Sequence, residues 1–414
     1  MEPSRAVRCI RCMHARRNIL AALSLLALAA PGVASAGSGV GDALVLRAPG
    51  GGGLTLVDAS TGRALRNLPA GALSADGKTL LTARVQRGST LVRRLSVVSG
   101  KTVAKRTVPG AWGFQRASED GTLVAGGEHG LSVALVAADR ASGYHGTART
   151  TRVAVLPATL TGRLRVLELQ GNFGVDAFGP NGQYLYLIQH LQGEHYKVRA
   201  YDLLADRLDP QTVVDKGEPN EQMAGLPLAR AENSTGTLVL TLYRRPSGVP
   251  FVHALMANSL YALCIDLPSA ARVDPSAHSS WGVAMQGTRL YLANAASGFV
   301  GIVDTASMKF AQSASLGAQT PTEPLTRPLA AASDGTRLYL ARPQGLVSID
   351  ASTLTASAPL TNHSFGSVVL GTGGTVLYGA GQGATQALDP RTGSSDASPW
   401  TTGELSLVSV VKAA

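Results

Sequence analysis

The chain has 414 residues, of which 45% are hydrophobic, 15% charged and 5% aromatic, with 47 glycines and a formal net charge of +10. The apolar fraction is too high for a disordered protein, and the charged fraction is too low for a coiled coil. The glycines follow no three-residue period, which excludes a collagen-like fibre and leaves a large globular fold rich in turns.

Residues 1–36 have the pattern of an export signal. Five arginines and one acidic residue precede the apolar run Ile19 to Ala30, and the small-residue site Ala34-Ser35-Ala36 follows. This order is typical of a cleaved secretory signal peptide. A membrane anchor is the alternative, but twelve residues span only about 18 Å as a helix, against about 30 Å of hydrocarbon. We therefore expect a mature chain in the periplasm, the cell wall or the medium, with a short linker over 37–42.

The signal is compatible with two export routes, and the rest of the chain gives two indications about partners. Arg16-Arg17-Asn18-Ile19-Leu20 resembles a twin-arginine signal but lacks the usual flanking Ser or Thr and Lys, so the Sec route is equally compatible. No later stretch reaches 18 apolar residues, so the mature chain is not expected to span a membrane. Without the signal the net charge is +6, which is not the profile of a nucleic-acid-binding protein.

Cysteines offer no framework for the fold. Cys9 and Cys12 form a C-x-x-C pattern, but both lie in the segment expected to be removed. Cys264 is alone on an apolar strand and is interpreted as a small core residue. The mature chain therefore has no internal disulfide, and its stability depends on packing.

The mature chain contains a repeat. Residues 328–360 have the order strand, Asp-Gly turn, strand, loop, strand ending in Asp, strand, and residues 281–316 repeat it with the same string RLYLA. Gly, Asn and Asp tolerate the positive φ of tight turns. Such turn pairs recur along the chain, at Asp76-Gly77, Asp120-Gly121, Asn181-Gly182, Thr235-Gly236, Gln286-Gly287, Asp334-Gly335 and Gly373-Gly374.

A second marker is an apolar strand that ends in aspartate. The functional interpretation is an acidic ring, and the simpler one is that each carboxylate accepts backbone N–H bonds in the turn that follows. The simpler one is favoured. Six strands carry the marker, and they end at Asp58, Asp202, Asp266, Asp304, Asp350 and Asp389.

Four strands in about 40–50 residues are the signature of a β-propeller blade. Gly287 to Asn294 followed by Gly298 to Thr305 resembles the repeat of YVTN-type propellers, a WD-repeat-like family of secreted bacterial proteins, with Tyr291-Leu-Ala-Asn294 at the position of the naming tetrapeptide. The next unit has Arg342 where that asparagine is expected. The resemblance covers roughly 43–411 and implies a propeller of the same kind.

The two ends of the chain predict the blade number. Residues 43–70 supply three strands without an inner one, and 404–411 supply a single strand. Together they complete one blade, which closes the ring and removes its sheet edges. The fold predicted for 43–414 is therefore an all-β, single β-propeller of four-stranded blades. The repeat count gives eight blades, with seven as the alternative.

Chemistry-bearing motifs are few. The sequence has no nucleophile elbow, no zinc-protease helix, no phosphate-binding loop and no EF-hand spacing. Two Glu-His pairs, Glu128-His129 and Glu194-His195, follow the second strand of adjacent units, and equivalent propeller loops emerge on one face. They are candidate ligands of a divalent metal or candidate acid–base groups. The alternative is that they are ordinary polar loop residues.

An aromatic residue followed by glycine precedes the inner strand of four units. The functional interpretation is an aromatic channel mouth that binds a flat or apolar ligand. The favoured alternative is that each ring fills the gap between neighbouring blades. The four pairs are Trp112-Gly113, Phe173-Gly174, Trp281-Gly282 and Phe365-Gly366.

One segment is strongly basic. From Lys78 to Arg116 there are nine basic residues and no acidic one. A solvated outer edge is the default interpretation of such a run, since Lys and Arg on outer strands also prevent aggregation. The alternative is a docking face for a protein or for an anionic polymer of the cell envelope.

Two classes of function follow. The first is an exported, non-catalytic binding or scaffold propeller with a ligand at the channel mouth. The second is a propeller enzyme, lactonase- or hydrolase-like and metal-dependent, that uses the same face. Propellers host both classes, and the absence of a catalytic motif in the sequence favours the first.

Overall fold

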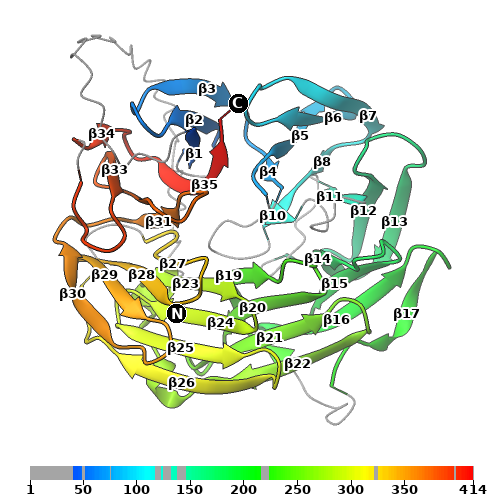
Figure 1. Cartoon of the computed structure of the whole chain (residues 1–414). Coiled ribbons are helices and arrows are strands. Elements are labelled where there is room, and N and C mark those ends of the chain that lie inside the picture. The colour runs from blue at the N-terminus through cyan, green and yellow to red at the C-terminus, as the bar shows by residue number, and fades with distance from the viewer. Residues whose placement is uncertain are drawn as a thin grey trace, which may run out of the picture. The chain divides into compact units, whose positions relative to one another are not determined.

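Apolar segments between Gly, Asn and Asp turns form antiparallel sheets, and these sheets surround a centre as the blades of a ring (Figure 1). The computed structural model describes residues 41–48, 52–74, 76–116, 123–124, 132–137, 146–215, 223–320, 325–395 and 398–413, all within the compact unit Ala36–Ala414. Apart from two 3₁₀ helices, η2 (Ser269–Ala271) and η3 (Pro275–Ser280), the regular elements in these ranges are strands.

Blade 1 joins the two ends of the described chain. Its sheet has the order β3-β2-β1-β35, with β1 (Asp42–Arg47), β2 (Leu54–Asp58), β3 (Ala64–Leu68) and β35 (Ser406–Lys412). Ala43 pairs with Asp58 on one side and with Val411 on the other. The predicted closure by a shared blade is confirmed, since β35 is the inner strand that β1–β3 lack.

Six further blades follow the chain, each numbered from its inner strand outwards. Blade 2 consists of β4 (Ala72–Leu73), β5 (Thr79–Gln86), β6 (Ser89–Ser96) and β7 (Thr102–Pro109). Blade 4 consists of β14 (Asn172–Phe178), β15 (Tyr184–His190), β16 (His195–Asp202) and β17 (Arg207–Thr212), with β18 (Met223–Ala224) also paired to β16. Blade 5 consists of β19 (Leu226–Glu232), β20 (Leu238–Arg244), β21 (Pro250–Met256) and β22 (Tyr261–Asp266). Blade 6 consists of β23 (Trp281–Gln286), β24 (Arg289–Asn294), β25 (Phe299–Asp304) and β26 (Lys309–Ser315). Blade 7 consists of β27 (Leu329–Ala331), β28 (Arg337–Arg342), β29 (Gly345–Asp350) and β30 (Ala356–Thr361). Blade 8 consists of β31 (Ser367–Leu370), β32 (Leu377–Gly381), β33 (Ala384–Leu388) and β34 (Trp400–Thr401).

Blade 3 departs from the regular pattern. Its four strands are β8 (Trp112–Gly113), β11 (Ser132–Ala137), β12 (Thr150–Pro157) and β13 (Arg165–Gln170), and a separate hairpin of β9 (Gln115–Arg116) and β10 (Leu123–Val124) follows β8. The short strand β10 approaches the inner strands β4 and β14 of the two neighbouring blades, toward the centre of the ring in Figure 1. With blade 3 included, the described residues form eight four-stranded blades, and the predicted number is confirmed.

The core lies between the blades. Leu240 and Leu242 of blade 5 pack in one cluster with Leu290 and Leu292 of blade 6, and similar clusters join the other neighbours. Burying a leucine side chain contributes roughly 1.5–3 kcal/mol, so each pair of neighbours adds stability. Strand β24 is buried from Leu290 to Asn294 because both of its faces meet another blade.

The turn chemistry is also confirmed. The six predicted turn glycines that the structure describes have positive φ, from 56° to 71°, while Gly121 lies outside the described residues. Five strand-ending aspartates accept backbone N–H bonds from the turn that follows: Asp58, Asp202, Asp304, Asp350 and Asp389. The sixth, Asp266, pairs with Arg245 instead. Among the described residues, no helix has the length and apolar character needed to cross a membrane.

Candidate functional site

One face of the ring gathers the loops between second and third strands and the connections from one blade to the next. Because the strands are antiparallel, these two kinds of segment leave the sheets on the same side. We call it the connector face. In blades 4 to 6 it carries the loops 191–194 and 245–249 and the connection 267–280, which contains η3.

A polar cluster on this face joins three successive segments. Arg244, at the end of β20, donates from Nη2 to Oε1 of Glu194 over 3.0 Å, and their side chains are 21% and 31% exposed. The backbone oxygen of Glu194 accepts from Gly225 N–H. His278 of η3 is half-buried, and burial lowers its pKa; Arg244 lowers it further, while Asp274 and Glu194 act in the opposite direction. We call Glu194, Arg244, Asp274 and His278 the connector cluster.

Two atoms of the connector cluster are closed off from water without a partner. Oε2 of Glu194 and Nε2 of His278 have no hydrogen-bond partner within the described ranges. A buried polar atom without a partner costs about 1–3 kcal/mol, so such atoms often face a ligand or an ordered water. One is a carboxylate oxygen and the other an imidazole nitrogen, which are groups that bind divalent cations.

The predicted metal ligands are only partly visible. Glu194 belongs to the connector cluster, and His195 is the exposed first residue of β16. Glu128 and His129 lie outside the described residues. Within the described ranges no three His, Cys, Asp or Glu side chains are close enough to hold a metal. The metal site therefore stays a prediction. Sequence reasoning missed Arg244, Asp274 and His278; the signal for Arg244 was its place at the end of the second strand of the next blade, just before the equivalent loop.

The four aromatic residues lie in separate inter-blade clusters and do not meet. Trp112, Phe173, Trp281 and Phe365 are 0–2% exposed. Trp112 packs with Val92 of blade 2 and Leu135 of blade 3, and Trp281 meets the ring of Phe299 edge-on at 5.7 Å. This burial agrees with rings that fill gaps between blades. A ligand could reach these four rings only if neighbouring blades separated, so their ligand-binding role stays a prediction.

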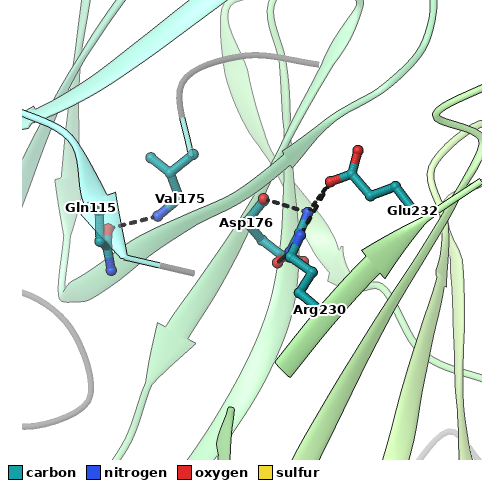
Figure 2. Close-up of polar contacts among 5 residues, drawn as sticks. All are labelled: Gln115, Val175, Asp176, Arg230 and Glu232. Carbon is teal, nitrogen blue, oxygen red and sulfur yellow. Dashed lines mark hydrogen bonds and ion pairs between the residues drawn. The ribbon is translucent and has the colours of Figure 1, made fainter. Parts of the chain in front are cut away.

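The glycine at position 174 leaves room on β14 for the β9–β10 hairpin that follows β8. A Cβ at Gly174 would lie 2.6 Å from Nε2 of Gln115 and 3.0 Å from Nε2 of His190. Val175 N–H donates to Oε1 of Gln115 over 3.0 Å, as Figure 2 shows. Glycine at this position therefore allows β9 to bind β14 closely.

A buried ion cluster lies on the inner strands β14 and β19. Asp176 is an unpaired bulge residue, since Val175 pairs with Leu187 and Ala177 with Tyr186, and bulges redirect side chains. Arg230 donates to Oδ1 of Asp176 over 2.6 Å, to the backbone oxygen of Asp176 over 3.0 Å and to Glu232 over 2.9 Å (Figure 2). Burial alone would lower the pKa of Arg230, but the two carboxylates raise it above its ordinary value.

His253 of β21 lies in the same blade as Arg230 of β19, two strands further out. It shares one face of blade 5 with Arg230 and Thr241, because Arg230 pairs with Thr241 and Thr241 with His253. Its ring centroid is 6.0 Å from those of Tyr196 and Tyr243. Both ring nitrogens are buried without a partner in the described residues. Burial lowers the pKa of His253 to about 4, so the ring is neutral at neutral pH.

Comparisons with known proteins agree with the fold. No family model and no curated protein sequence matches the chain. Among solved structures, dihydro-heme d1 dehydrogenase NirN in complex with DHE is similar over 90% of this chain and 75% of its own, with a TM-score of 0.52 and 14% identity. AztD from Citrobacter koseri is similar over 78% and 95%, with a TM-score of 0.41 and 11% identity. A putative 6-phosphogluconolactonase from Bacteroides uniformis is similar over 82% and 97%, with a TM-score of 0.38 and 14% identity.

The first of these likenesses agrees with the fold and says nothing of activity. At identities this low, the first of them shows the fold alone, and the others are too distant to support an argument. The described residues thus form an eight-bladed β-propeller.

Proposed function

We propose that the protein is an exported, non-catalytic binding propeller of YVTN type, with its ligand on the connector face at blades 4 to 6. The observation that carries this proposal is the pair of unpartnered atoms in the connector cluster, Oε2 of Glu194 and Nε2 of His278. Propeller loops of this kind are held by rigid strands, so they can carry a site without weakening the fold. Export is supported by the signal pattern of residues 1–36.

The ligand of this proposal is a divalent cation. The connector cluster has two carboxylates, those of Glu194 and Asp274, and one guanidinium, that of Arg244. The lowered pKa of His278 favours its neutral form. The net charge of the cluster is therefore negative, which favours a cation. Carboxylate oxygen and imidazole nitrogen suit zinc, and since no third His, Cys, Asp or Glu among the described residues joins Glu194 and His278, water would have to complete the coordination.

Zinc titration of the purified mature protein tests the proposal. We expect about one zinc per chain by calorimetry and by metal analysis. Glu194→Gln combined with His278→Gln should abolish binding. Glu168→Gln, which removes an exposed carboxylate from β13, is the control and should bind as the wild type does. Equal binding by the double variant would refute the site.

A second candidate is a metal-dependent hydrolase at the same place. A half-buried histidine with a lowered pKa beside Glu194 has the character of a general base, and this favours it. In that case the zinc-loaded protein should hydrolyse a simple lactone, and both Glu194→Gln and His278→Gln should remove the activity. Zinc binding without lactone hydrolysis would favour the binding protein.

A further inference from the structure

The basic segment divides between the two faces of blade 2. Arg94 and Arg106 lie on the face toward blade 3, where Leu81, Ala83 and Val92 pack with Trp112. Nη1 of Arg94 donates to the backbone oxygen of Ala158 over 3.2 Å. Nη1 of Arg106 donates to the backbone oxygen of Gly162 over 2.8 Å. These two arginines therefore have structural partners in blade 3.

The other face is directed toward blade 1. Leu80 and Leu95 pack there with Leu54 and Leu56 of blade 1. Side chains on one face recur every second residue, so Arg84 of β5 and Arg93 of β6 share this face with Leu80 and Leu95. Lys105 of β7 is directly opposite Arg93.

Arg66 of β3 approaches blade 2 from blade 1, at the end of the blade where β6 turns into β7. Its partner in β2 is Leu56, which packs toward blade 2. Its side chain lies against the β6–β7 turn, because a Cβ at Gly100 would be 2.5 Å from Cδ of Arg66. Figure 1 shows blades 1 and 2 as neighbours in the ring. We call Arg66, Arg84, Arg93 and Lys105 the basic face.

The charges of the basic face are uncompensated. Within the described parts of the chain, none of the four side chains has an ion pair or a hydrogen bond. Like charges directly opposite each other, as Arg93 and Lys105 are, destabilise an antiparallel pair. Nε of Arg93 is also shut off from water without an acceptor. An arrangement that costs stability in the free protein points to an anionic partner.

We propose that the basic face binds an acidic polysaccharide. Several positive charges along one blade suit a linear polyanion, which supplies many acceptor groups in a row. Sites for single-stranded nucleic acid add aromatic side chains on which bases stack, and protein interfaces favour aromatic residues over lysine. From Lys78 to Pro109 there is no aromatic residue at all. A polymer without bases or apolar side chains is therefore the partner that fits.

Polysaccharide binding at controlled salt tests this proposal. We expect the mature protein to bind heparin and polygalacturonate at about 50 mM salt but not neutral dextran, with affinity falling steeply as salt rises. The variant Arg84→Gln, Arg93→Gln, Lys105→Gln should bind about tenfold more weakly or worse. Its plot of log affinity against log salt should be flatter by about one unit for each positive charge that no longer meets the polymer.

The matched control removes the same charge from other blades. Lys197→Gln, Lys309→Gln and Arg391→Gln replace exposed side chains of blades 4, 6 and 8 and should leave binding nearly unchanged. Equal weakening by both triple variants would reduce the effect to net charge and overturn the proposal. Failure of the wild type to bind either acidic polymer would do the same. So would a single-stranded DNA probe that binds more tightly than both polymers and is lost in the first variant.

A single substitution distinguishes a loss of binding from a loss of folding. Arg84 is exposed, so Arg84→Gln should keep the wild-type melting temperature and still weaken heparin binding by a measurable factor. An unchanged affinity in a folded Arg84→Gln protein would exclude this residue and the face built on it.

Discussion

The buried histidines make stability depend on pH. Burial lowers the pKa of both His190 and His253 to about 4, against an ordinary value of 6.5. Between pH 6.5 and pH 4 the unfolded chain therefore binds more protons than the folded one. The free energy of unfolding should fall as the pH drops through this window, by about 1.4 kcal/mol for each unit of pKa difference per histidine.

Urea unfolding at several pH values between about 7 and 4 checks this prediction. His253→Phe keeps an aromatic ring beside Tyr196 and Tyr243 but cannot take up a proton. It should remove about half of the pH dependence that His190 and His253 together contribute in this window. A variant with the full wild-type slope would show that His253 is protonated as easily in the folded protein as in the unfolded one.

Single positions also explain a departure from the repeat motif. Asn294 donates from its side chain to Ala277 O and accepts from Ser297 N–H, so it satisfies backbone groups of the connection beside it. Arg342 occupies the corresponding place in blade 7 and donates to the backbone oxygens of Ala295, Leu316 and Gly317. Two different side chains at corresponding strand ends thus both bond backbone groups of the neighbouring loops and connections.

Local chemistry was predictable from the sequence, whereas partners across blades were not. The aspartate turns depend on residues two or three positions apart, so their spacing was sufficient to predict them. The pair of Asp176 and Arg230 joins residues 54 positions apart and depends on a bulge in β14. The signal that was overlooked is a charged residue, Arg230, in the middle of a buried inner strand.

Among the elements, the inter-blade rings should have large effects on stability. Trp281 is 2% exposed and packs in the cluster that joins blades 5 and 6. Trp281→Ala should therefore cost about 3–5 kcal/mol of the free energy of unfolding, measured in urea. Trp281→Phe, which still fills most of the gap, should cost clearly less. A loss below about 1 kcal/mol for the alanine variant would mean that the ring is not a wedge and lines an open mouth.

The order of the elements was largely predictable, with blade 3 as the exception. Four strands and a tight turn recur in each unit, and their apolar character on both faces follows from packing between blades. The hairpin of β9 and β10 was not predicted, because its strands are two residues long and carry no periodic signal. Its place depends on the contact of Gln115 with β14 of the next blade.

At the scale of the whole ring, stability should depend on β35. This strand pairs with β1 and packs beside β31, so it joins blade 1 to blade 8. Asp42 strengthens the same junction, since Thr372 donates to it from 330 positions away and Lys412 pairs with it at 3.1 Å. Removal of residues 404–414 should leave β1 with an open edge and lower the melting temperature of the entire ring in one transition.

Calorimetry distinguishes the outcomes of that truncation. A protein that melts at the full-length temperature would show that the blades hold together without the junction. A shorter deletion, of residue 414 alone, leaves β35 and the bond from Ala413 N–H to the backbone oxygen of Gly41 intact and serves as the control, since it should melt as the full chain does.

The shared blade also sets an order of events during synthesis. The strands β1 to β3 leave the ribosome before the other described strands, and their missing neighbour β35 is made only after the other seven blades. Until then β1 presents an unpaired edge, which is a template for pairing with other chains. A growing chain of this design is most exposed to aggregation just before β35 is made, and a holding factor that covers β1 would protect it for the whole of that interval.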